Sequence, residues 1–446
     1  MMSELVDLAQ AAVDAARVAG ADWCDAFCSD VTEVSVEVEN SSINYCATIR
    51  DQGLSVRAYT RGGQGFASVQ TLSLQSAREC AQRAVAMSRA AHPDPDFVRL
   101  PERDEIGEVP GLFDEELAGL GADAWVRWCA RGIEEARAVA DDAIVQGGAG
   151  AGWGESALAS STGIAVTRRG SSASLYFFVI INRDGDVGSY YEHDQARRLA
   201  DLEPEGIATK AAQQALRQLG SRPIRTARLP IILGPLATMS LVGSVIGAAN
   251  AESVQRNRSY LAGREGERIA SELLTVREEP HVPAGMRSSP VDGEGVPTMP
   301  RTLIDAGVLT TYLHNSYTAF KAGLAPTGHA SRSGYESTVG ISASNLQIQP
   351  GERTEAELIA QVDEGLYIAH AGLSPNPVTG EVSTTADFGY RIERGELTTP
   401  LSTTLIGSTA DELLGGIDAI SSDYREEPGF IMPSLRIVSV QVASEG

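Results

Sequence analysis

Lysine and cysteine are both scarce in this chain of 446 residues. Lys210 and Lys321 are its only lysines, and 36 Lys and Arg against 59 Asp and Glu give a formal charge of −23. Such a charge repels phosphate backbones and anionic lipid surfaces, so we expect neither nucleic acid nor a membrane as a partner. The five cysteines all lie in the first third of the chain. An odd number in a large chain does not suggest a disulfide framework, and we expect a cytoplasmic protein.

Signals for secretion or membrane insertion are also not expected. Glu4 and Asp7 stand where a secretory signal carries positive charge, so the N-terminus predicts an amphipathic helix. The uncharged stretch 229–251 is long enough to cross a bilayer. Pro230 and Pro235, together with several glycines and serines, interrupt it and disfavour a lipid-facing helix. We expect a buried strand there, followed by a buried helix.

Local motifs for hydrolysis are missing as well. G-x-S-x-G, the strained turn that positions the serine of α/β hydrolases, does not occur. Helical zinc motifs place two histidines within about one turn, whereas the histidines here are at least 15 residues apart. Ligands could still converge through the tertiary structure. The six histidines are His92, His193, His281, His314, His329 and His370.

A glycine-rich stretch at 147–157 contains a partial nucleotide-binding pattern. Gly152, Gly154 and Ala157 match G-x-G-x-x-A. The following segment, 158–170, has the pattern of a strand, whereas a dinucleotide site needs a helix whose N-terminus faces the pyrophosphate. We therefore expect a flexible glycine loop rather than a dinucleotide site.

Two small clusters of reactive residues have a structural interpretation beside the functional one. Cys24 and Cys28 could be redox or metal ligands, but four-residue spacing on a strand places both on one face, and we expect core cysteines. Glu192, His193 and Asp194 could form an acid–base site. Because no nucleophile or orienting partner is visible nearby, we interpret this stretch, 190–198, as a solvated loop.

Hydrophobic periodicity predicts an α+β protein. Segment 93–121 is rich in Pro, Asp, Glu and Gly and predicts a linker, and the turn at Glu393–Gly395 predicts a hairpin. Helices are predicted over 4–19, 73–91, 122–139, 203–219 and 237–250, and strands near 34–40, 54–60, 142–147, 156–168 and 172–182. We expect a first N-terminal α+β domain (helix, antiparallel strands, helix) at 1–100, a second α+β block at 101–222, and a predominantly β domain at 223–446 that holds one buried apolar helix.

Segments from end to end resemble, in order, those of the TldD/PmbA metallopeptidase family. The first block contributes a G-x-x-V-R strand, a glycine turn and a G-F-A strand, and the second contributes a Gly-centred turn between strands. The third block has the most specific matches. The matching stretches include DQGLSVRAYTRGGQGFASVQT, SSTGIAVTRRGSSASLYFFV, LPIILGPLATMSLV, SPVDGEGVPT, TLIDAGVLTTYLHNSYTAFKAGLAPTGHA and NPVTGEVSTTADFGYRIERGEL.

The resemblance also indicates a subclass. TldD-type subunits carry H-E-x-x-x-H on the apolar helix, with a cysteine downstream as a further zinc ligand. In this chain the corresponding hexamer is Gly243 to Ala248, with Ser244 in place of the glutamate. No cysteine follows Cys129. The resemblance therefore implies a PmbA/TldE-type subunit without metal or catalytic residues of its own. The zinc would lie on a TldD-type partner in a heterodimer that cuts small unfolded or modified peptides. We expect Gly243, Gly247 and Ala248 to leave room on a buried helix.

Six polar residues are candidates for contacts with a peptide substrate in such a cavity, although each could instead serve a turn or a structural hydrogen bond. Two alternative functions stay open: the partner subunit of a dedicated amide or peptide hydrolase in natural-product biosynthesis, and a stand-alone peptide-binding homodimer. The candidate residues are Asp292, Glu294, His314, Asn315, His329 and Asn376.

Overall fold

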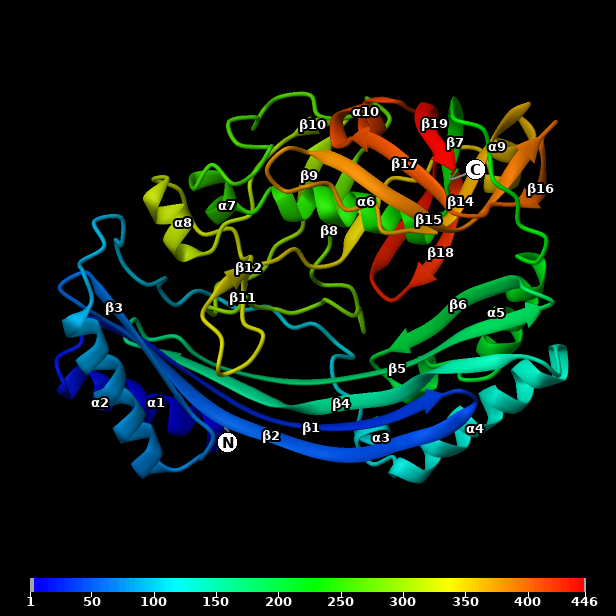
Figure 1. Ribbon diagram of the computed structural model, residues 1–446. Helices are drawn as coiled ribbons and strands as arrows, with labels where there is room; N and C mark the ends of the chain where they lie inside the picture. The colour runs from blue at the N-terminus through cyan, green and yellow to red at the C-terminus, as the bar shows by residue number, and fades with distance from the viewer. Residues whose placement is uncertain (1–3, 445–446) are drawn as a thin grey trace.

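The first half of the chain forms one curved, antiparallel six-stranded sheet (Figure 1). The computed structural model describes residues 4–444; residues 1–3 and 445–446, the ends of the expected domains 1–100 and 223–446, lie outside the described residues. The strand order is β3-β2-β1-β4-β5-β6. The strands are β1 Trp23–Glu39, β2 Ser42–Thr60, β3 Gly63–Val69, β4 Ile144–Ser160, β5 Ala165–Arg183 and β6 Asp186–Ala196.

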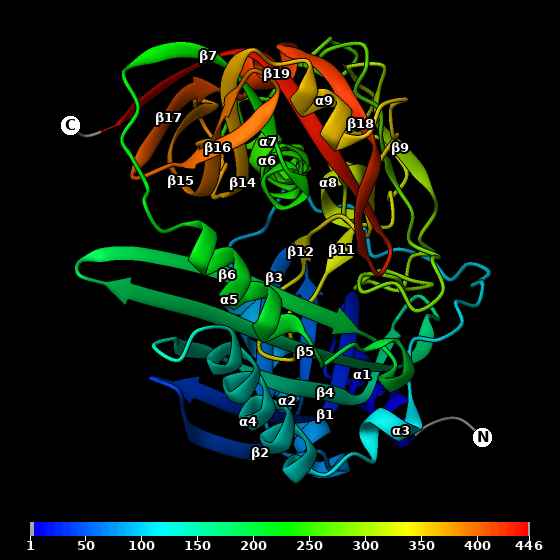
Figure 2. The same ribbon diagram turned by 90° about the vertical axis from the view of Figure 1, so that its right-hand side faces the viewer.

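Helices cover one face of this sheet at both of its ends (Figures 1 and 2). Cys24 and Cys28 lie on the helix-facing side of β1, buried in the core beneath α1 and α2, so the prediction of core cysteines is confirmed. Trp125 and Cys129 of α4 are fully buried in a second core at the other end. The helices are α1 Glu4–Val18, α2 Leu74–Ala90, α3 Glu115–Ala118, α4 Ala122–Val139, the 3-10 turn Leu199–Asp201 and α5 Ile207–Arg217.

The glycine-rich stretch 147–157 belongs to strand β4, so the predicted flexible loop is wrong. Strand β4 pairs with β1, and the two expected N-terminal blocks therefore share one sheet. A Cβ atom at Gly148 or Gly150 would lie 2.5 or 2.4 Å from a carbonyl oxygen of β1. Glycine permits this close strand approach, which is why the residues that predicted a loop form a strand.

The predicted solvated loop at 190–198 is also wrong, because residues up to 196 form the edge strand β6. Glu192 is buried, and it accepts hydrogen bonds from Arg425 (2.6 Å) and Lys210 (2.7 Å). Glu427 bonds to Arg425 (2.6 Å) and to His193 (3.2 Å). We call these five residues the Arg425 cluster. Glu192 and Arg425 are 233 residues apart in sequence, so local pattern cannot reveal that they pair.

The C-terminal domain is rich in strands, as predicted. Its larger sheet has the order β10-β9-β8-β13-β19-β17-β15-β14-β7, and β7 also pairs with β19, so five strands close on themselves. Its strands are β7 Ala227–Leu233, β8 Val276–Glu278, β9 Arg301–Asp305, β10 Val308–Leu309, β11 Ala330–Ser331, β12 Gly340–Ile341, β13 Leu346–Ile348, β14 Glu364–Ala371, β15 Glu381–Glu393, β16 Glu396–Pro400, β17 Thr404–Thr409, β18 Ile417–Glu427 and β19 Phe430–Ser444.

The uncharged stretch 229–251 forms the buried strand β7 and the helix α6 (Pro235–Ala248), as predicted. None of the helices in the described part of the chain is long and apolar enough to cross a membrane. The hairpin at Glu393–Gly395 is confirmed between β15 and β16. The other helices of this domain are α7 Ala251–Gln255, α8 Ser316–Lys321, α9 Glu355–Ala360 and α10 Ala410–Gly415.

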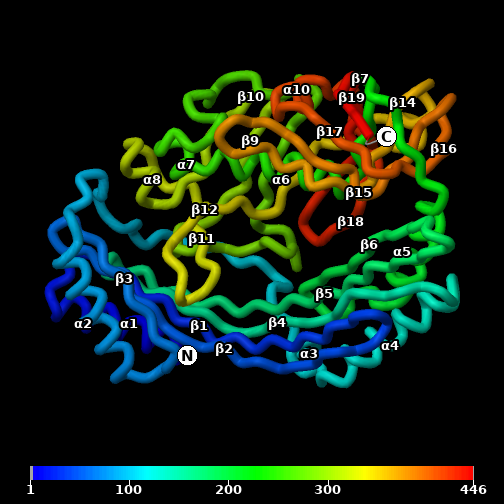
Figure 3. Tube along the Cα trace, viewed as in Figure 1, coloured from blue at the N-terminus to red at the C-terminus, as the bar shows by residue number. Residues whose placement is uncertain are grey.

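The C-terminal domain lies over the concave face of the six-stranded sheet, opposite the N-terminal helices (Figure 1). The predicted linker runs between the two layers (Figure 3) and contacts α8 through Asp94–Tyr317 (2.9 Å) and Asp96–Lys321 (2.7 Å). The segment joining β11 and β12 descends onto the sheet, where Tyr335 is buried. The concave sheet face and the loops above it therefore form the inner surface of the molecule.

Candidate functional site

Asp292 and Glu294 lie on one turn of the C-terminal domain, close above the sheet. The Asp292 carboxylate accepts backbone N–H groups of Glu294 (2.8 Å), Val296 (3.0 Å) and Ala330 (3.0 Å). Burial, assisted by the charge of Glu294, raises the pKa of Asp292 to about 7. Asp292 therefore shapes the turn and is still partly protonated at neutral pH.

Glu294 joins the turn to the sheet. Its carboxylate accepts hydrogen bonds from the Arg57 side chain of β2 (2.8 Å) and from the backbone N–H of Ser316 (2.8 Å). Arg57 also bonds to Asp25 of β1 (3.1 Å), which lies 3.1 Å from Arg332. Burial opposes the ionisation of Asp25, but Arg57 and Arg332 hold its pKa below its usual range. We call Asp25, Arg57, Glu294 and Arg332 the Arg57 cluster.

His314 and His329 are brought together by a shared threonine. The Thr327 hydroxyl donates to the carbonyl of His314 (2.9 Å) and bonds to Nδ1 of His329 (2.7 Å). Nε2 of His329 bonds to the buried Glu278 carboxylate, and Nδ1 of His314 bonds to Thr318 (3.2 Å). Burial lowers the pKa of His314. These bonds fit the structural interpretation of both histidines.

Asn315 and Asn376 both serve local structure. The Asn315 side chain accepts the backbone N–H of Thr318 (3.0 Å) and so caps the N-terminus of α8. Asn376 is exposed, and its side chain accepts the backbone N–H groups of Val378 (2.9 Å) and Thr379 (3.1 Å) in a turn. The structure therefore brings five of the six candidate residues together and leaves Asn376 apart from them.

Helix α6 is buried along one side and open along the other. A Cβ atom at Gly243 or Gly247 would meet nothing within 4 Å, whereas Ala248 is buried in the core. The remaining position, Ser244, bonds through its hydroxyl to Ser374 (3.0 Å). Room is therefore left at the two glycines, as predicted, but not at Ala248.

This open side of α6 does not fit a zinc ion. Zinc sites in proteins use imidazole, thiolate or carboxylate ligands, and Gly243, Ser244 and Gly247 supply none of these. Within residues 4–444, no group of three or more His, Cys, Asp or Glu side chains is arranged to hold a metal ion.

Two hollows lie between the sheet and the turn that carries Asp292. One of about 460 Å³ is lined by Asp292, Arg332 and Arg168 among others, and one of about 370 Å³ lies over β4 and β5 and also includes Arg168. A third hollow of about 420 Å³ adjoins the Arg425 cluster and the N-terminus of α6. The inner surface of the molecule thus offers polar, partly cationic binding space.

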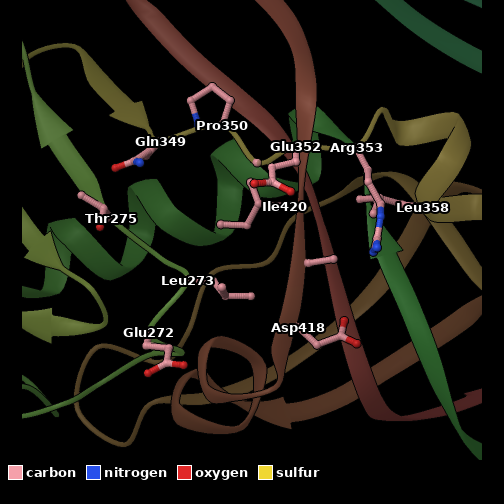
Figure 4. A pocket seen from close by; sticks show the side chains of 12 residues that line it. Glu272, Leu273, Thr275, Gln349, Pro350, Glu352, Arg353, Leu358, Asp418 and Ile420 are labelled. Carbon is pink, nitrogen blue, oxygen red and sulfur yellow. The ribbon is translucent and has the colours of Figure 1, made fainter.

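A separate hollow of about 480 Å³ lies on the C-terminal domain and is lined by none of the six candidate residues (Figure 4). Two of its four charged side chains bond to neighbours: Asp418 pairs with Arg436 (2.8 Å), and Arg353 bonds to Gln361 (3.3 Å). Residues such as Leu273 and Leu358 supply apolar contact area. We therefore place the candidate site on the inner surface.

Sequence reasoning missed several residues of this site, including Asp25, Arg57, Arg168, Glu278 and Arg332. Arg57 and Glu294 are 237 residues apart, so their ion pair has no signature in local spacing. The one available signal is a charged residue inside the apolar strand pattern at 54–60, because an arginine buried in a sheet needs an acidic partner.

Comparisons with known proteins cover the whole chain. Models of PmbA/TldA metallopeptidase domain 1, central domain and C-terminal domain match residues 24–88, 115–219 and 226–444. The chain is 28% identical to Metalloprotease PmbA of Escherichia coli O157:H7, over 100% of this chain and 95% of the relative. It is 26% identical to the Metalloprotease PmbA homolog of Haemophilus influenzae, over 99% and 96%.

A solved structure agrees with this assignment. The crystal structure of TldE from Thermococcus kodakarensis superimposes with a TM-score of 0.88 at 26% identity, covering 97% of this chain and 98% of that one. This chain is thus similar to its relatives in both sequence and fold over nearly its whole length. The chain belongs to the PmbA/TldD metallopeptidase family.

Proposed function

We propose that this chain is the non-metal-binding subunit of a two-subunit PmbA/TldD peptidase. In this proposal a TldD-type partner carries the catalytic zinc, and the two chains enclose a cavity in which small unfolded or modified peptides are cut in the cytoplasm. The observation that carries the proposal is the open side of α6, where Gly243, Ser244 and Gly247 offer no metal ligand within an otherwise complete family fold.

The remaining contribution of the chain is shape and peptide contacts. Helix α6 keeps its packing through Leu241, Val242 and Val245, which are buried, so loss of metal ligands on its open side does not disturb the fold. The polar inner surface around Asp292 and Glu294 supplies the wall against which a peptide can lie. An enclosed cavity of this kind selects substrates by size and flexibility.

The test is reconstitution. The chain alone, a TldD-type partner alone and their mixture are compared for bound zinc by elemental analysis, for size by light scattering, and for cleavage of short peptides. We expect zinc only on the partner and full cleavage only in the mixture. Zinc-dependent cleavage by the lone chain contradicts the proposal, and a stable self-dimer that refuses the partner supports the peptide-binding homodimer instead.

A bulky substitution on α6 tests whether its open side faces the shared cavity. Ser244→Trp should leave the thermal stability of the lone chain nearly unchanged, because the neighbouring glycines face open space, but should lower cleavage by the mixture at least tenfold. Glu134→Trp, on the exposed side of α4, is the matched control and should leave cleavage intact. Equal cleavage by both variants would place the cavity elsewhere.

A further inference from the structure

Arg168 of β5 stands between the two hollows on the inner surface and lines both of them. The floor of the smaller hollow includes Gly152, Gly154 and Gly170, which present backbone rather than side chains. An extended main chain can therefore lie close to the sheet there. The end of such a bound chain would reach Arg168, which also lines the larger hollow.

Arg168 has unused hydrogen-bonding capacity. Its guanidinium makes one long hydrogen bond, to the carbonyl of Val291 (3.4 Å), and forms no ion pair at contact distance with any residue in the range 4–444, although the charge of Asp292 acts on it from farther away. Two neighbouring arginines have partners of their own: Arg332 pairs with Asp25, and Arg197 donates to the carbonyls of Gly285 (3.0 Å) and Met286 (2.7 Å). Arg287, which also lines the larger hollow, is exposed and lies over the ring of Phe430. Arg168 is half-buried, and no carboxylate among the described residues pairs with it directly, although the chain has a net charge of −23.

The acidic groups of the larger hollow, Asp292 and Glu278, are hydrogen-bonded to other residues, and within the described range neither forms a contact ion pair with Arg168. Asp292 already accepts three backbone N–H groups, and burial with the charge of Glu294 raises its pKa to about 7. Glu278 bonds to His329 and to the backbone N–H of Ser344. The Ser344 hydroxyl is buried without a hydrogen-bond partner among the described residues. The hollow thus keeps a cation and a hydroxyl available for a ligand.

We infer that this hollow is a carboxylate-binding subsite, in which Arg168 holds the C-terminal carboxylate of a short peptide that lies over β4 and β5. A planar guanidinium matches a carboxylate with two parallel hydrogen bonds, which is stronger and more directional than a single contact. The inference rests on the proposed function, because it names the end of the peptide substrate that this subunit would hold.

Binding of blocked model peptides tests the subsite without any cleavage. The probes are N-acetyl-tetraalanine with a free C-terminal carboxylate and the same peptide as its C-terminal amide, titrated calorimetrically into the full-length chain alone and into its complex with the partner. The native protein should bind the free acid at least tenfold more tightly than the amide. Arg168→Gln should reduce this preference to about one, and Arg168→Lys should keep part of it.

Arg183→Gln is the matched control, because Arg183 is an exposed arginine at the end of the same strand and pairs with Asp142. It should keep the full preference. If thermal unfolding shows that Arg168→Gln does not fold, Arg168→Lys is the variant to measure. Its preference for the acid over the amide should lie between that of the native protein and one.

A third probe separates the two sources of a carboxylate. An N-acetylated, C-terminally amidated peptide with one internal glutamate should bind like the amide; if it binds as tightly as the acid and loses affinity in Arg168→Gln, the subsite stands but takes acidic side chains. Equal binding of acid and amide by the native protein, a preference that Arg168→Gln retains, or no binding of any probe overturns the inference. Since the readout is affinity, it is independent of which chain carries zinc and performs cleavage.

Discussion

The C-terminal domain is attached to the six-stranded sheet by two arginine-centred clusters of different character. In the Arg57 cluster all four side chains are almost completely buried, and the backbone of α8 adds a hydrogen bond to Glu294. In the Arg425 cluster Arg425 is partly exposed, Lys210 is more than half exposed, and a hollow of about 420 Å³ lies beside it.

The two clusters differ in how firmly they hold the domain to the sheet. Removing one partner of a buried ion pair leaves an uncompensated charge in a low-dielectric environment, which costs about 3–5 kcal/mol. In the Arg425 cluster the carboxylates are buried, but water reaches Lys210 and part of Arg425, so these cations lose less when a partner is removed. The end with Arg57 should therefore hold the two layers in place, whereas the end with Arg425 can rearrange around a ligand or a second chain.

The largest effect is expected from Arg57→Gln, which leaves the carboxylates of Asp25 and Glu294 without their shared cation. We expect a loss of about 3–5 kcal/mol in the free energy of unfolding, measured by urea denaturation. Arg50→Gln, on the same strand but in an exposed pair with Asp30, is the control and should leave the denaturation midpoint nearly unchanged. Similar midpoints for both variants would show that the Arg57 cluster stabilises the fold no more than an exposed ion pair does.

Tyr335→Ala tests the same fixed end without changing charge. Tyr335 is buried against Phe27, Leu158 and Ile164, and its hydroxyl donates to Asp51 (3.1 Å). Loss of the ring should cost about 3 kcal/mol through the cavity left behind. Tyr335→Phe, which removes the hydroxyl alone, should cost about 1 kcal/mol in the same denaturation experiment. An equal cost for the two variants would show that the hydroxyl, not the ring, anchors the segment.

Acid unfolding probes the more open end through Glu427. Burial opposes its ionisation, but hydrogen bonds from His193, Gln195 and Arg425 outweigh it and lower the pKa of Glu427 to about 2. A carboxyl with a lowered pKa stabilises the fold above its unfolded pKa and loses that contribution as the pH falls towards 2. Glu427→Gln should remove up to about 3 kcal/mol of stability at pH 7. Parent and variant should therefore converge near pH 2, and a constant difference across this range would contradict the assignment.

Asp292 should show the opposite pH dependence, with the smallest net effect. Because its pKa is raised to about 7 in the folded chain, its contribution is most favourable below pH 4 and is lost progressively between pH 4 and 7. The stability of Asp292→Asn relative to the parent should therefore increase as the pH rises over this interval. At pH 7 the variant should be more stable than the parent by a net amount of about 1 kcal/mol, because an amide accepts fewer of the three backbone hydrogen bonds and this loss applies at every pH. Thermal unfolding at pH 4, 5.5 and 7 measures it, and a gain that shrinks with rising pH would contradict the pKa direction.

Periodicity and local composition predicted much of the fold. The apolar stretch 229–251 interrupted by proline predicted a buried strand and helix, and the turn at Glu393–Gly395 predicted a hairpin; both are present. These features depend on residues close in sequence, whose spacing decides which face is apolar. Segments 147–157 and 190–198 were predicted as loops and form strands, because pairing with distant strands outweighed glycine content and local polarity.

The amino-acid sequence alone shows that α6 has no zinc ligands on its open side, because Gly243, Ser244 and Gly247 carry no imidazole, thiolate or carboxylate. The fold is what gathers Asp25, Arg57 and Glu294 into one buried cluster and places Arg168 between two hollows with no ion-pair partner in contact among residues 4–444. These contacts join residues that are far apart along the chain. Side-chain chemistry is local information, whereas burial and charge pairing arise when strands hundreds of residues apart are brought into one sheet and covered by one domain.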